Sequence, residues 1–171
     1  MKKSFAFLFI CLFSCSLLQA QDDDLFSRKG KILLETGYNL VAGVFPGTGL
    51  SLVQSDGQTI TSLAADMGYF LQENFALKFR LGVVSGGGAT VTSIGAGGKY
   101  YIAGVVPVEA TVGLYTGNGT DTFGANFSLG YAVGLAPNIL LEPSFGAILG
   151  DEIISQESIA LQLRLAFAMI L

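Results

Sequence analysis

The 171-residue chain offers few of the side chains on which enzymes rely. It contains no histidine, so it lacks the imidazole base of serine, cysteine and most zinc hydrolases. Its two cysteines, Cys11 and Cys15, both lie in an apolar N-terminal run, and thiolate chemistry is not expected in the rest of the chain. We therefore predict no catalytic residues and no enzymatic activity.

Acidic and glycine-rich clusters are the other sequence features that could bind a ligand. The three acids at 22–24 are typical of a solvated tail, and the acids within 151–157 lack the regular oxygen spacing of a calcium loop. The glycines at 86–88 and 95–98 are not followed by a helix that could bind a phosphate. We predict no metal site and no cofactor; a divalent cation held by 151–157 and bridging lipopolysaccharide phosphates is the less favoured interpretation.

Nine charged residues share one property: each lies on the opposite face of its segment from the large apolar residues. They are Lys31, Glu35, Asp66, Lys78, Arg80, Lys99, Glu109, Glu142 and Arg164. With five bases and four acids the set is nearly neutral. We predict that these charges pair as a structural plug. The alternative is a selective polar or proton path gated by Arg80, Arg164, Glu109 and Glu142.

The segments that carry these charges are predicted β-strands, because large apolar residues alternate with small or polar ones at a period of two. In 75–83, for example, every odd position is apolar, and the even positions include Lys78 and Arg80. Eight segments of ten to thirteen residues show this pattern, which is long enough for a tilted strand to cross a bilayer. They are 31–43, 58–70, 75–84, 91–102, 106–116, 123–135, 139–149 and 159–171.

The links between these segments alternate in length. Short links at 71–74, 103–105 and 136–138 alternate with mostly longer links at 44–57, 85–90, 117–122 and 150–158. Tight turns at one end and longer loops at the other are typical of outer-membrane barrels. We predict an all-β fold, an eight-stranded antiparallel up-and-down transmembrane β-barrel over residues 30–171.

The alternation alone leaves open which face points outward. A soluble lipocalin-like carrier would turn the apolar faces inward, but eight strands enclose too little volume for so many Phe and Leu side chains. A Lys or Arg that faced lipid at the midplane would cost about 2–4 kcal/mol. We therefore predict that the charged faces line the lumen and the apolar faces contact lipid, with the lipocalin-like carrier as a distant alternative.

Three tyrosines recur at intervals of 31 residues, at Tyr69, Tyr100 and Tyr131, each near the end of a strand that leads to a short link. This interval equals one strand–loop–strand–turn unit. Tyrosine rings are enriched where a membrane meets water. We predict that these three side chains lie at one membrane interface.

The N-terminal residues 1–20 have the layout of a secretory signal, with a basic head, an apolar run and Ala20 before a polar stretch. We predict cleavage after Ala20 and a short acidic periplasmic lead-in at 21–29; a retained anchor and a lipoprotein at Cys15 are less favoured. Residues 21–171 contain seven Lys/Arg and 13 Asp/Glu. This acidity argues against nucleic acid as a partner.

Three turn regions carry a family resemblance. Residues 68–77 (GYFLQENFAL), 99–102 (KYYI) with 107–113 (PVEATVG), and 130–143 (GYAVGLAPNILLEP) resemble the small outer-membrane β-barrels called the porin family, similar in topology to the OmpX and OmpA barrels. The resemblance implies a Gram-negative outer membrane, both termini in the periplasm, insertion by the barrel-assembly machinery, and contact with lipid and lipopolysaccharide. Such barrels usually end on an aromatic residue, whereas this chain ends on Leu171.

These features together predict a non-enzymatic integral outer-membrane protein. Its role would be structural or in surface interaction, with the outer loops contacting envelope components or an extracellular partner. The alternative is a narrow porin-like channel for small solutes or ions. Open aqueous channels usually need about sixteen strands, which favours the structural role.

Overall fold

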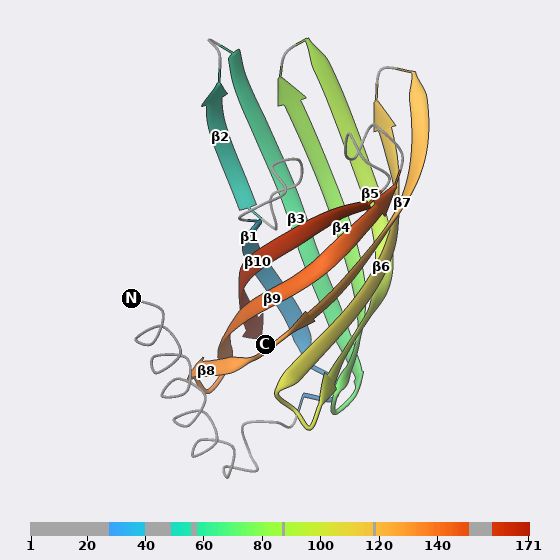
Figure 1. Ribbon diagram of the computed structural model, residues 1–171. Coiled ribbons are helices and arrows are strands. Elements are labelled where there is room, and N and C mark those ends of the chain that lie inside the picture. Colours follow the sequence, from blue (N-terminus) through green and yellow to red (C-terminus); the bar gives the residue numbers. More distant parts are fainter. Residues whose placement is uncertain (1–27, 40–48, 56–57, 87, 118, 151–158) are drawn as a thin grey trace, which may run out of the picture.

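The computed structural model describes residues 28–39, 49–55, 58–86, 88–117, 119–150 and 159–171. These residues form ten β-strands (Figure 1). The strands are β1 (Ile32–Asn39), β2 (Gly49–Ser55), β3 (Gln58–Gln72), β4 (Phe75–Gly86), β5 (Ala89–Ile102), β6 (Val106–Gly117), β7 (Thr120–Gly130), β8 (Val133–Ala136), β9 (Ile139–Gly150) and β10 (Ile159–Ile170). Within the described part of the chain, no helix is long and apolar enough to span a membrane.

The ten strands make up the eight walls of one closed antiparallel barrel. β1 and β2 form a single wall, because both pair with β3, and β7 and β8 form another along β9. From β3 to β9 each wall pairs with the next in the chain, and β9 pairs with β10. β1 closes the barrel by pairing with both β10 and β3. The predicted eight-stranded up-and-down barrel is confirmed.

The two ends of the barrel differ. The terminal end contains Arg28, Leu171 and the turns that join β3 to β4, β5 to β6 and β8 to β9, and these turns are the predicted short links. Ile32 and Leu171 exchange backbone hydrogen bonds of 2.8 and 2.9 Å there, which ties the start of β1 to the last residue. The opposite, hairpin end contains the β4–β5 and β6–β7 turns (Figure 1).

Several predicted boundaries are wrong at the hairpin end. β2 occupies part of the predicted link 44–57, and most of 85–90 and 117–122 is strand rather than loop. Gly88 and Gly119 have φ angles of 81° and 79°, a left-handed conformation that lets a chain reverse in a tight turn, so the strands pair almost to the tips. The predicted strand 123–135 is interrupted between β7 and β8. Residues 40–43 and the link at 151–158 lie outside the described residues.

The outer surface of the barrel is apolar over most of the described strand length. Along β10 the odd-numbered side chains from Leu161 to Met169 are exposed and the even-numbered ones from Gln162 to Ile170 are buried. Phe79 and Leu81 on β4 are 49% and 51% exposed. Soluble monomers rarely expose so wide an apolar surface to water, whereas the outer face of a membrane barrel exposes it to lipid. This arrangement is the reverse of a lipocalin-like carrier and contradicts that alternative.

The interior at the terminal end is filled by a small apolar core. Its buried side chains are Leu33, Phe70, Ala76, Tyr101, Ala132, Leu140, Ala168 and Ile170. The Phe70 and Tyr101 rings lie 6.0 Å apart, centroid to centroid. The core therefore closes the terminal end of the lumen below the polar residues described next.

Glycine is required where neighbouring strands crowd the inner wall. A Cβ atom at Gly97 on β5 would collide with the backbone oxygen of Ala110 and lie 2.6 Å from the Cα atom of Thr111. We expect Gly97→Ala to lower the free energy of unfolding by about 1–3 kcal/mol, the usual cost of overpacking. Urea unfolding in lipid vesicles measures it. Ser93→Ala, on the same face of β5, is the control, and equal effects of the two changes would contradict the collision.

Candidate functional site

Eight charged side chains meet in the middle of the lumen, and we call them the lumen charge cluster. Seven are between 1% and 6% exposed, and the side chain of Arg80 is 25% exposed. They come from seven of the ten strands. The cluster consists of Glu35, Asp66, Lys78, Arg80, Lys99, Glu109, Glu142 and Arg164.

Strand register brings these residues to one level of the barrel. Glu35 on β1 lies opposite Asp66 on β3, and Asp66 lies opposite Arg80 on β4. Lys99 on β5 lies opposite Glu109 on β6 in the same way. Because successive strand side chains alternate between faces, each residue two positions from a lumen-facing one also faces the lumen. Lys78 enters the cluster next to Arg80 for that reason.

Lys78 is the most highly connected cation of the cluster. Its Nζ atom donates a hydrogen bond to Glu35, lies 3.0 Å from Oδ1 of Asp66, and donates to Oε2 of Glu109 at 2.9 Å. These acids come from β1, β3 and β6, which are not all neighbours in the sheet. Lys78 therefore links side chains across the lumen rather than along one wall.

Lys99 makes a second centre on the side nearer the terminal end. Its Nζ atom donates to Glu35 and to Glu142, so Glu35 is shared with Lys78. The hydroxyl of Tyr101 donates to the other oxygen of Glu142 at 2.8 Å. Tyr101 thus joins the charged layer to the apolar core below it.

Two arginines complete the cluster toward the hairpin end. Nη2 of Arg80 donates to Oδ2 of Asp66 at 2.5 Å and lies 3.5 Å from Oε1 of Glu109. Arg164 is more loosely placed, with Nη2 3.5 Å from Asp66 and Nη1 3.6 Å from Glu109. Both arginines share the same two acids, which are also the partners of Lys78.

The cluster holds four cations and four anions, and its formal charge is zero. Taking charges out of water costs several kcal/mol for each ion, and only close partners repay that cost. Lys31, the ninth residue of the predicted set, lies outside this group: it is exposed and precedes the first residue of β1. The predicted set of nine contains five bases and four acids. Without Lys31, the cluster in the structure contains equal numbers of positive and negative charges.

Neutral polar groups and small cavities lie beside the cluster. The Gln162 side-chain amide donates to Oδ1 of Asn126. A cavity of about 10 Å³ lies beside Arg80, lined by Thr111 and Tyr115 among others, and a second of the same size lies beside Arg164. Each has room for about one water molecule. Beside these two arginines, side chains leave little more space than one water molecule needs.

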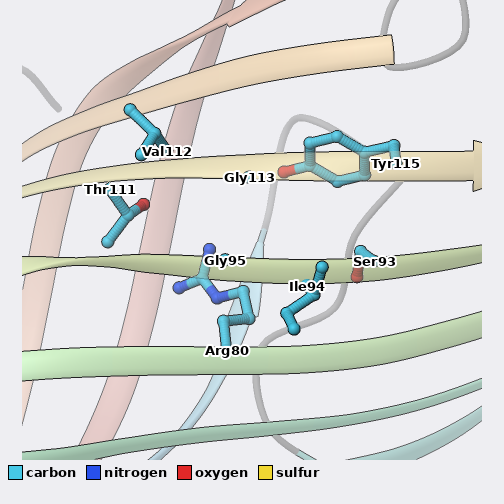
Figure 2. Close-up of a pocket in the computed structure, with 8 residues that line it drawn as sticks. All are labelled: Arg80, Ser93, Ile94, Gly95, Thr111, Val112, Gly113 and Tyr115. Atoms are coloured by element: carbon cyan, nitrogen blue, oxygen red, sulfur yellow. The ribbon is translucent and has the colours of Figure 1, made fainter. Parts of the chain in front are cut away.

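Figure 2 shows the first of these cavities. The side chain of Arg80 crosses Gly95 and turns its guanidinium toward Thr111, while the Tyr115 hydroxyl points along β6 toward Gly113. Gly95 and Gly113 are direct cross-strand partners. Since neither has a side chain, the inner wall leaves space for the long arginine at this level.

Arg28 is an interior residue that the periodicity of the strands could not reveal, because it precedes β1 in the segment predicted as a periplasmic lead-in. Its side chain is buried, with the guanidinium 4.0 Å from the Tyr101 ring centroid and Nη2 donating to the Gly104 carbonyl at 3.0 Å. Its backbone N–H donates to Oε2 of Glu73 at 2.9 Å. Burial lowers the pKa of Arg28 from its usual value. Arg28 therefore caps the terminal end of the lumen.

Replacing Arg28 with alanine is expected to lower the free energy of unfolding by about 1–3 kcal/mol, because a cation–π contact and a buried hydrogen bond are lost. Lys29→Ala removes an exposed cation next to it and is expected to change stability by less than about 0.5 kcal/mol. The temperature at which the folded band disappears on a gel compares the stabilities of the two variants with that of the wild type. If the two variants unfolded at the same temperature, Arg28 would not act as a cap.

The three predicted interface tyrosines lie near the terminal end of the barrel. Tyr69 and Tyr100 are 47% and 49% exposed, on the outward faces of β3 and β5. Tyr131 is half-buried between β7 and β8, and its N–H donates to the carbonyl oxygen of Pro143. Tyr69 and Tyr100 thus lie on the outer surface near the terminal end, whereas Tyr131 lies at a break in its strand; the interfacial role of the three rings stays a prediction.

Within the described ranges, no group of three or more acidic, histidine or cysteine side chains is arranged to hold a metal ion. The carboxylates of the lumen charge cluster are each bound to lysine or arginine. The arrangement shows mutual charge compensation between these acids and their lysine and arginine partners.

No protein-family model and no curated protein sequence matches the chain. Among solved structures, the chain is similar to the outer-membrane protein Ail of Yersinia pestis, with 12% identity over 84% of this chain and 100% of Ail, at a TM-score of 0.50. It is also similar to the N-terminal barrel of Pseudomonas aeruginosa OprF, with 13% identity over 84% of this chain and 98% of that domain, at a TM-score of 0.48. The likeness to Ail and the closed antiparallel topology agree: the chain has the fold of a small outer-membrane β-barrel.

Proposed function

We propose that this chain is an integral outer-membrane protein with a non-enzymatic, structural or surface-interaction role. The observation that carries the proposal is the combination of an apolar exterior with buried, mutually compensated charges in the lumen. The exterior requires lipid, and the charge-compensated lumen leaves the outer surface and the loops as the parts that face possible partners. The absence of histidine from the sequence supports a role without hydrolytic chemistry.

The proposed biogenesis follows from the sequence. Residues 1–20 would be removed as a secretory signal, the barrel-assembly machinery would insert the barrel, and both termini would face the periplasm. The hairpin end would then face outward, where its loops meet lipopolysaccharide and extracellular partners. The position of Arg28 and Leu171 at one end of the barrel supports a common side for both ends of the mature chain.

Membrane fractionation and heat-modifiable gel mobility test this proposal. We expect the protein in the outer-membrane fraction, with a folded band whose mobility changes on boiling. A soluble periplasmic protein whose band does not shift would contradict it. Mass spectrometry of the purified protein would show whether the mature chain begins at Gln21.

A narrow channel is the second candidate. The partial exposure of Arg80 favours it, because this side chain is 25% exposed and lies beside a small cavity. Planar-bilayer recording separates the two roles. Resolved unitary conductance from the refolded protein would support the channel. A protein that shows no conductance, although the gel assay shows that it is folded, would support the structural role.

A further inference from the structure

The outward faces of β3 to β7 change character at one level. From Leu71 on β3, and from the terminal ends of β4 to β7, every outward position is apolar, glycine or tyrosine up to Leu63, Val83, Ile94, Leu114 and Phe123. Beyond that level the outward positions carry hydroxyl groups and one acid. We call this set the hydroxyl belt: Thr59, Thr61, Ser85, Thr90, Thr92, Thr116 and Asp121.

The hydroxyl belt is continuous across five strands. Thr61 lies opposite Ser85, and Ser85 lies opposite Thr90. The row resumes two residues along β5, where Thr92 lies opposite Thr116, which in turn lies opposite Asp121. The hydroxyls of Ser85 and Thr90 are 3.0 Å apart, within hydrogen-bond distance. All but Thr61, which is half-buried, are exposed.

The belt borders the lipid-facing band directly. Val83 pairs with Leu63 on one side and with Thr92 of the belt on the other. On β4 the apolar positions run from Phe75 to Val83. This length, at about 3.3 Å per residue and a tilt of about 40°, covers about 20 Å, close to the apolar band of about 25 Å in outer-membrane barrels. The belt therefore lies at the depth of lipid headgroups.

The charges at the two ends of the barrel differ. In the described residues, the outward positions at the level of the belt hold no lysine or arginine, and Asp121 is their one charged group. Exposed cations lie at the terminal end, at Lys29 and Lys31. A surface that bound lipid phosphates would use such cations. Hydroxyls both donate and accept hydrogen bonds and match the hydroxyls of a sugar.

We propose that the hydroxyl belt binds the sugar headgroups of a membrane glycolipid, in the leaflet at the hairpin end, without cationic contacts to its phosphates. The proposal rests on the proposed function for its membrane setting. The belt would then be a lipid-binding surface that selects lipids with sugar headgroups through hydrogen bonds. Divalent cations are not needed for the contact, because it does not involve bridging between acids and phosphates.

The experiment compares the rate of unfolding in urea from three kinds of vesicle. The first contains phosphatidylcholine alone, the second phosphatidylcholine mixed with an uncharged digalactosyl glycolipid, and the third phosphatidylcholine mixed with phosphatidylglycerol. Binding to the folded state stabilises it. We expect the glycolipid to slow unfolding of the wild-type protein by about threefold or more, with or without EDTA. Phosphatidylglycerol is expected to have a smaller effect.

The variant Ser85→Ala/Thr92→Val/Thr116→Val removes three hydroxyls of the belt at nearly constant shape. It is expected to lose most of the glycolipid effect while unfolding normally in phosphatidylcholine. Thr122→Val, on the inward face of β7, is the control and should keep the effect. A triple variant that keeps it, or an equal effect of phosphatidylglycerol, would overturn the proposal. Failure to insert into phosphatidylcholine would instead count against the proposed function.

Discussion

Replacing Lys78 with methionine is expected to lower the free energy of unfolding by about 3–5 kcal/mol, the cost of leaving buried charges without a partner. Lys78 contacts Glu35, Asp66 and Glu109, and none of these acids reaches bulk water. The variant would leave the lumen charge cluster with one uncompensated negative charge. Urea unfolding in vesicles measures the loss, and the gel assay shows whether the variant folds.

Two further variants give this prediction its contrast. Lys31→Met removes an exposed lysine just before β1 and is expected to change stability by less than about 0.5 kcal/mol. The double variant Lys78→Met/Glu109→Gln restores neutrality and is expected to recover more than half of the loss. A Lys78→Met protein as stable as the wild type would mean that the cluster is hydrated and open, as a channel requires.

Placing a charge on the lipid-facing surface is expected to have the second largest effect. Phe79 lies in the middle of the apolar positions of β4 and is 49% exposed. Phe79→Arg should cost about 2–4 kcal/mol, because an arginine at the bilayer midplane is poorly solvated. The yield of folded protein in vesicles and its unfolding midpoint measure the cost.

The same strand supplies a matched control. Ser85 lies on the same face as Phe79, three outward positions farther along, in the hydroxyl belt. Ser85→Arg is expected to cost about 0–1 kcal/mol, the value near an interface. Phe79→Ala separates the loss of the ring from the gain of the charge. Equally small costs for the two arginine variants would place both positions in water and would contradict the membrane orientation of the barrel.

The fold was largely predictable because a transmembrane barrel repeats one local rule. Alternation at a period of two identifies each strand, and the cost of a charge in lipid decides which face points outward. The positions of eight of the nine predicted charged residues in the lumen follow from that rule. Lys31 has the same parity but lies before the start of β1, where the parity no longer determines the environment of a side chain.

Strand ends were less predictable than strand centres. The segments around Gly88 and Gly119 are rich in glycine, serine and threonine, a composition typical of loops. The strands nevertheless continue almost to both turns. Once two strands are paired, each further residue adds backbone hydrogen bonds with its neighbour, and this cooperative gain exceeds the weak local preference. The separate strand β2 within 44–57 is an example of the same effect, since its pairing with β3 decides its conformation.

Sequence alone determined the class of the protein: an apolar exterior, a charged lumen and no histidine follow from residue types and their spacing. Tertiary structure decided which charges meet. Glu35 lies 43 residues from Lys78 and 64 from Lys99, and only the closure of β1 against β3 and β10 brings it between them. The interior position of Arg28 was also decided by the tertiary structure, because its partners come from turns distant in the chain. Alternation reports the face of a residue, whereas its partners depend on register and closure, which are properties of the whole barrel.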